Sequence, residues 1–104
     1  MLQITSEKDK VTAKIDGELD HHFSALIREE IDSVLEHSLP KILELDFSGV
    51  TFMDSSGIGL IMGRYKIVRS MNGKIVIKNA NSNITKLLRM AGISHLAEIQ
   101  EGDE

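Results

Sequence analysis

Two adjacent serines, Ser55 and Ser56, follow an aspartate where a predicted buried strand (42–47) leads into a helix-periodic apolar run. Asp54 and Ser55 are residue types that cap helix N-termini, because their short side-chain oxygens accept bonds from free N–H groups of the first turn. A hydroxyl at this position is exposed, and the helix dipole would favour a phosphate group attached to it. Two interpretations stay open from these residues alone: helix capping, or a site of phosphorylation.

Three glycines, Gly57, Gly59 and Gly63, follow the serines and superficially suggest a phosphate-binding loop. The dinucleotide fingerprint requires its third glycine one residue earlier, and no Gly-Lys-Ser/Thr ending of a P-loop is present. A glycine inside a helix costs about 1 kcal/mol relative to alanine, so three near one helix start indicate a need for close contact. We expect Gly57 and Gly59 to allow close approach of backbone, either of this protein or of a partner, and Gly63 to let the helix lie close to the sheet.

Catalysis by Ser55 or Ser56 would require a nucleophile elbow, Gly-x-Ser-x-Gly, but neither serine has a glycine two residues before it. Nothing in the sequence places His21 or His22 beside Ser55 as a general base. A metal ion shared by the two histidines is disfavoured, because adjacent helical residues point about 100° apart. We therefore predict a protein that is not an enzyme and has no catalytic residue, metal ion or cofactor of its own.

A second block, Gly-Glu-Leu-Asp-His-His at 17–22, precedes the first predicted helix. The first block is Phe-Met-Asp-Ser-Ser-Gly-Ile-Gly at 52–59, continued by Gly-Arg-Tyr-Lys at 63–66. Together the two blocks resemble the signatures of the anti-sigma factor antagonists, which are STAS-domain proteins, and the resemblance is strongest to the sporulation type. The blocks stand in the family's order and at a similar separation, and the resemblance covers almost the whole chain.

This resemblance implies a partner switch controlled by phosphorylation. Ser55, the first serine after Asp54, matches the phosphoacceptor; an anti-sigma factor with serine kinase activity would phosphorylate it using ATP, and a phosphatase would reverse this. The unphosphorylated protein would bind the anti-sigma factor and so release a sigma factor. The predicted partner-binding residues are Glu18, Asp20, His21, Asp54, Ser56, Gly57, Ile58, Gly59, Leu60 and Arg64. A second hypothesis is a small-ligand or nucleotide-binding regulatory STAS domain of a stress-response or transport system.

The composition excludes several other classes. The chain has 104 residues, which fits one domain. Its formal net charge is −4, so we expect no direct binding of nucleic acid, which would call for a clustered basic face. It contains no cysteine, which excludes disulfides and thiolate catalysis. We see neither a signal peptide nor an apolar stretch approaching about 18 residues, so we expect no membrane span. We predict a cytoplasmic protein that is a monomer when free.

The hydrophobic periodicity predicts the order β-β-α-β-α-β-α-β in a single STAS-like α/β domain over residues 1–104. We expect a mixed sheet of four to five strands, which is mainly parallel and has an antiparallel hairpin at its start. The apolar run at 42–47 suggests a central strand covered on both faces. Asp20 is a candidate N-cap of the first helix. We expect strands at 2–5, 11–15, 42–47, 75–77 and 96–99, helices at 23–35, 56–71 and 84–91, a loop at 48–51, and a frayed acidic tail at 100–104.

The second predicted helix has more apolar residues than one buried stripe requires. The stripe that we expect to face the sheet contains Ile58, Ile61, Met62, Tyr65 and Val68. Leu60, Ile67 and Met71 lie partly off it. Apolar atoms left near solvent beside Ser55 would be either ordinary scattered exposure or a patch for a partner, and the resemblance favours the patch.

Overall fold

The computed structural model describes residues 2–102 and contains the predicted order of elements, so the α/β architecture is confirmed. The strands and helices are β1 (Leu2–Glu7), β2 (Lys10–Leu19), α1 (His21–Ser38), β3 (Ile42–Met53), α2 (Ser55–Ser70), β4 (Lys74–Ala80), α3 (Ser82–Met90), the short 3-10 helix η1 (Ile93–His95) and β5 (Glu98–Glu101).

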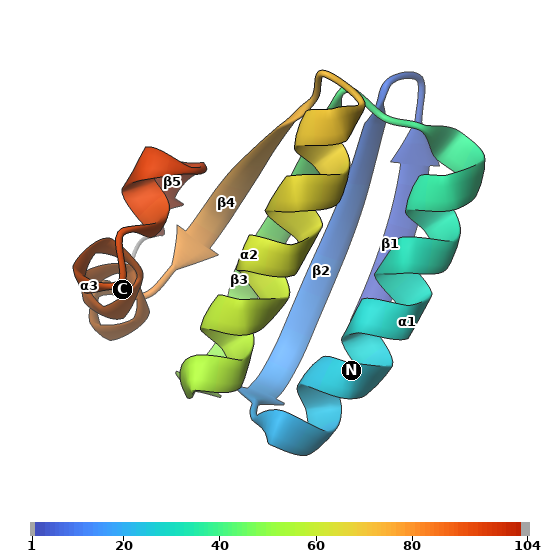
Figure 1. Cartoon of the computed structure of the whole chain (residues 1–104). Helices are drawn as coiled ribbons and strands as arrows, with labels where there is room; N and C mark the ends of the chain where they lie inside the picture. The colour runs from blue at the N-terminus through green and yellow to red at the C-terminus, as the bar shows by residue number, and fades with distance from the viewer. Residues whose placement is uncertain (1, 103–104) are drawn as a thin grey trace.

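The five strands form one sheet in the order β1-β2-β3-β4-β5, so every strand lies beside its neighbours in the sequence. β1 and β2 pair antiparallel as a hairpin, and the three remaining pairs are parallel. Parallel neighbours need a crossover connection, which is usually right-handed and here is a helix each time. α1 and α2 consequently lie next to each other on the same face of the sheet (Figure 1).

The core lies between this face and the helices. Alternate residues of a strand point to the same face, and buried apolar residues occupy alternate positions over much of β2, β3 and β4. The apolar stripe of α1 packs against them. The buried residues of these elements include Val11, Ala13, Ile15, Leu43, Leu45, Phe47, Ile75, Ile77, Ile27, Ile31 and Leu35.

The opposite face of the sheet differs from our prediction. β3 is the central strand and is parallel to both neighbours, as predicted. The prediction that apolar packing covers it on both faces is wrong, because Glu44 and Asp46 alternate with the core residues and point the other way. Glu44 is buried there among lysines of β2 and β4, with which it forms ion pairs.

Two predicted irregular segments are parts of strands. The predicted loop at 48–51 belongs to β3, because β2 extends beside it and pairs Gly17 with Val50. The predicted frayed tail is wrong at Gln100 and Glu101, which belong to β5 and pair with β4. The end of that tail, 103–104, lies outside the described residues. Both differences come from pairing with distant strands, which local composition does not reveal.

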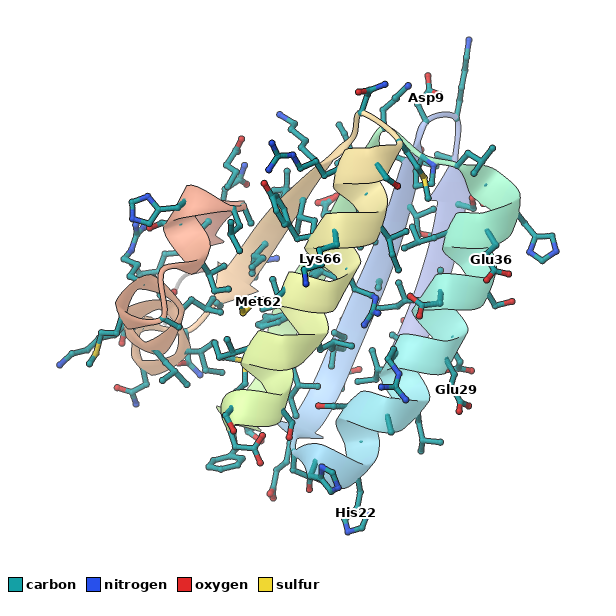
Figure 2. The ribbon with its side chains drawn as sticks, viewed as in Figure 1. Asp9, His22, Glu29, Glu36, Met62 and Lys66 are labelled. Atoms are coloured by element: carbon teal, nitrogen blue, oxygen red, sulfur yellow. The ribbon has the colours of Figure 1, made fainter. Side chains whose placement is uncertain are left out.

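The buried side of α2 also differs from the predicted stripe. Leu60 and Arg64 are only 4% and 6% exposed, whereas Met62 is 44% exposed and lies on the side of α2 that faces α3 (Figure 2). α2 packs against α1 as well as against the sheet, so its buried arc is rotated toward α1. The placement of Met62 on the buried stripe and of Leu60 partly off it was therefore wrong.

Candidate functional site

The fold brings the two sequence blocks together at one end of the sheet. β2 and β3 are parallel neighbours, and the last residue of β2, Leu19, is paired with the last residue of β3, Met53. The backbone N–H of Asp54 donates a hydrogen bond to the Leu19 carbonyl oxygen, with 3.4 Å between nitrogen and oxygen. Consequently α1 and α2 begin side by side, just beyond the carboxyl ends of these strands (Figure 1). In open α/β sheets this is the edge where binding sites usually form.

An aspartate caps each of these helices. Asp20 Oδ1 accepts a hydrogen bond of 2.9 Å from the backbone N–H of Phe23, which confirms its predicted capping role. Asp54 Oδ1 accepts one of 2.8 Å from the backbone N–H of Ser56. The two carboxylates thus satisfy free donors at two neighbouring positive helix ends.

The two serines have different environments. Ser55 is the first residue of α2 and is exposed, while Ser56 is half-buried on the side of α2 that faces α1. Beside them Phe52 is 49% exposed, and Ile58 is half-buried. A group transferred to the Ser55 hydroxyl would therefore project into solvent, or into any partner bound at this end of the molecule.

A groove of about 490 Å³ runs between α1 and α2, starting beside these serines. Sequence reasoning had singled out part of its lining, namely His21, Ser56, Gly59, Leu60, Gly63 and Arg64, and had missed Ser24, Ala25 and Arg28. Ser24, Ala25 and Arg28 lie three, four and seven residues after His21, which puts all four residues on one face of a helix. That spacing could have revealed a shared helix face, but not that α2 lies opposite it.

The glycines of α2 serve two different purposes. A Cβ on Gly57 would lie 2.3 Å from the Met53 Cγ atom, so this position requires the close approach that we predicted. A Cβ on Gly59 or Gly63 would have no neighbour within 4 Å. The prediction that Gly63 lets the helix lie close to the sheet is therefore wrong. At Gly59 no part of this chain approaches closely, and close approach of a partner stays a prediction. The missing side chains of both glycines widen the groove.

Arg64 forms a buried ion pair between the two helices. Its Nε atom lies 2.7 Å from Asp32 Oδ1 of α1, at an orientation that does not meet hydrogen-bond geometry, and its Nη1 donates to the Leu60 carbonyl oxygen. Burial lowers the pKa of Arg64, while the charge of Asp32 acts in the opposite direction. Arg64 and Leu60, which we predicted to bind a partner, are thus largely covered by other atoms of this chain.

The histidines stand at the same end of the molecule. The rings of His21 and His22 have centroids 5.6 Å apart, and His22 projects away from the body of the protein at the start of α1 (Figure 2). Across residues 2–102, no three histidine or carboxylate side chains gather in a way that could hold a metal ion. In the same described part of the chain, no helix combines the length and apolarity that crossing a bilayer requires.

Comparisons with known proteins agree with this architecture. The family model described as STAS domain matches residues 2–102. The anti-sigma F factor antagonist of Paenibacillus polymyxa is 32% identical over 104 residues, covering 98% of this chain and 89% of that protein. The unphosphorylated form of the anti-sigma factor antagonist SpoIIAA superposes with a TM-score of 0.84 at 26% identity, covering 95% of this chain and 87% of that one. The phosphorylated form of the Bacillus protein SpoIIAA superposes with a TM-score of 0.76 at 26% identity, covering 95% and 90%.

Proposed function

This chain belongs to the STAS domain family of anti-sigma factor antagonists, which are non-enzymatic regulators, and we propose that phosphorylation of Ser55 controls its binding to an anti-sigma factor. In this proposal the unphosphorylated protein binds an anti-sigma factor that is also a serine kinase, and a sigma factor is released. The kinase uses ATP to phosphorylate Ser55, which switches binding off, and a phosphatase restores the first state.

The exposure of Ser55 at the first position of α2 is the observation that carries this proposal. A kinase can reach this hydroxyl without unfolding the helix, whereas the neighbouring Ser56 is half-buried toward α1. The name of one solved relative, at 26% identity, says that it exists in a phosphorylated form, which supports the same chemistry here.

Electrostatics explain how phosphorylation would end binding. A phosphate group adds about −1.5 to −2 charges and three acceptor oxygens at neutral pH. In an interface centred on Ser55, this charge would be desolvated close to Asp54 and to the neighbouring cap Asp20. Burying an unpaired charge costs several kcal/mol, which is enough to abolish a typical association. The positive end of α2 favours the phosphate, so the fold itself need not change.

The proposed partner surface consists of the two helix starts. Its accessible members are Glu18, Asp20, His21, Asp54, Ser56, Ile58 and Gly59. Gly57, Leu60 and Arg64 are buried, so they would act mainly by holding α2 against β2, β3 and α1. We also propose that the protein acts in sporulation, that it is cytoplasmic, and that it is a monomer when no partner is bound.

Phosphopeptide mapping after incubation with ATP and the cognate kinase tests the assignment. We expect the Ser55→Ala variant to lose the modification and to retain partner binding, since Asp54, and not Ser55, is the N-cap of α2 and stays in place. The matched control, Ser56→Ala, should still be phosphorylated. Modification of Ser56 in a protein whose Ser55 is unmodified would contradict the proposal.

A further inference from the structure

We propose that the groove between α1 and α2 binds a small oxyanion, as free phosphate or as the phosphate group of a small molecule, through Ser24, Arg28 and Arg64. The site differs from the Ser55 hydroxyl, because these three residues line the space between the helices. It does not depend on the proposed partner switch, since it concerns the unphosphorylated chain without any partner protein.

Ser24 supplies the first argument. The residue is only 7% exposed, and its Oγ atom is buried without a hydrogen-bond partner among the described residues. Buried hydroxyl groups nearly always have a partner, because leaving one unpaired costs free energy. Ser24 lines the groove, so the missing partner can be an acceptor oxygen of a molecule that enters it.

Arg64 supplies a second buried group on the facing helix. It is 6% exposed and lines the groove from α2. A guanidinium group carries five N–H donors, and the contacts with Asp32 and with the Leu60 carbonyl oxygen involve Nε and Nη1 only. Donors therefore remain for an anion, and the fixed ion pair with Asp32 holds the guanidinium group in place before binding.

The charge in the groove favours an anion. Arg28 is exposed, lines the groove and forms no ion pair with any described residue. Two guanidinium groups against the single carboxylate of Asp32 leave a local charge of about +1, in a chain whose net charge is −4. The acids Glu29 and Glu36 of α1 point away from α2 (Figure 2), so they do not cancel this charge within the groove.

The space in the groove fits a small organic molecule. Its volume of about 490 Å³ falls within the range of about 300–1,000 Å³ that is common for ligand sites. Gly59 and Gly63 keep it open, because neither has a neighbour within 4 Å of where a Cβ would stand. Ala25 and Leu60 add apolar wall, which suits the carbon skeleton of a phosphomonoester better than bare phosphate.

The test is an NMR titration of the unphosphorylated full chain with inorganic phosphate, with glycerol phosphate and with acetate, all at constant ionic strength. We expect saturable shifts of the amides of Ser24, Arg28, Gly59 and Gly63 with the two phosphate compounds, and none with acetate. Arg28→Gln should weaken phosphate binding about tenfold, the loss expected for one charge-assisted hydrogen bond. Ser24→Ala should also weaken it and keep a native spectrum, because the hydroxyl makes no bond within the described chain.

Arg69→Gln is the matched control, because its guanidinium group lies later on α2, where it donates to the Tyr65 hydroxyl, and does not line the groove. Phosphate binding should be unchanged in this variant. Equal weakening by Arg28→Gln and Arg69→Gln would overturn the proposal, since it would show attraction by overall charge only. Shifts confined to 55–57 that survive Arg28→Gln, equal binding of acetate, or shifts that never saturate would overturn it too.

Discussion

At the scale of single residues, the charge of one side chain at position 55 should set the affinity for the anti-sigma factor. Asp54 remains the N-cap of α2, and an acidic residue is favourable in the first turn of a helix, so Ser55→Asp should keep α2 folded. Aspartate adds one charge, so the variant should resemble the phosphorylated state only in part. We expect its partner binding to weaken by about 1–3 kcal/mol, which is roughly fivefold to 150-fold in affinity. Isothermal titration of wild type and variant against the partner measures this difference.

The neutral variant Ser55→Asn separates charge from shape. Asparagine matches aspartate in size but carries no charge, so Ser55→Asn should lose less affinity than Ser55→Asp. The three proteins should unfold at similar temperatures. If Asn and Asp weaken binding equally, shape controls the switch, and the electrostatic explanation of phosphorylation is wrong.

Asp20 combines a structural role with a proposed one, and two substitutions separate them. Asp20→Ala removes the hydrogen bond to the Phe23 N–H and should lower the free energy of unfolding by about 1 kcal/mol. Asp20→Asn keeps an acceptor oxygen and should leave stability nearly unchanged. Because we propose that the carboxylate meets a basic group of the partner, both variants should bind it more weakly. Wild-type affinity in Asp20→Asn would mean that Asp20 only caps α1.

At the scale of elements, replacing glycine by alanine should have opposite effects on stability at two positions of α2. A Cβ on Gly57 would stand 2.3 Å from Met53 Cγ and 3.2 Å from Leu19 Cδ2, so Gly57→Ala should destabilise the protein by about 1–3 kcal/mol. A Cβ on Gly63 meets nothing within 4 Å, so Gly63→Ala should stabilise α2 by about 0.5–1 kcal/mol. Urea denaturation of both variants measures the two changes, and changes of the same sign would contradict this account of α2.

The packing of α2 also shows where sequence patterns stop being informative. Apolar periodicity predicted the helix correctly, because amphipathic spacing follows from the helical repeat alone. It misplaced Leu60 and Met62, because the buried arc depends on α1 as well as on the sheet. The Arg64–Asp32 ion pair was likewise invisible, since its members are 32 positions apart and meet only after both helices have docked.

At the scale of the whole molecule, the order of elements and the neighbouring positions of the two blocks were predictable, and the full extent of β3 was not. Alternating strands and helices imply parallel strands with adjacent carboxyl ends, which places Asp20 near Asp54. Residues 48–51 have a loop-like composition, yet they form a strand because β2 supplies their hydrogen-bond partners. The groove could not be predicted either, since facing surfaces of two helices make it.

The open face of the sheet is held together by charge instead of apolar packing. Glu44 of β3 lies 2.9 Å from Lys78 Nζ of β4 and 3.2 Å from Lys10 Nζ of β2, so one carboxylate joins three strands. The hydrogen bond from Lys78 is the largest influence on Glu44 and lowers its pKa below the ordinary value of 4.5, although burial acts the other way. The same contact raises the pKa of Lys78, which affects stability only in strongly alkaline solution.

A carboxylate whose pKa is lower in the folded state stabilises the protein above its unfolded pKa, and that contribution is lost as the pH falls through the folded value. Glu44→Gln should therefore lower the free energy of unfolding by about 1–2 kcal/mol at neutral pH. The difference from wild type should shrink once the pH drops below the ordinary Glu44 value of 4.5. Urea denaturation of both proteins between about pH 7 and pH 3 follows this change. The control is Glu98→Gln. Glu98 and Lys74 are 3.8 Å apart and about half exposed, so their ion pair should contribute little to stability at any pH.

A difference between Glu44→Gln and wild type that stays constant down to the lowest pH would contradict this explanation. It would show that lost packing, not lost charge, destabilises the variant.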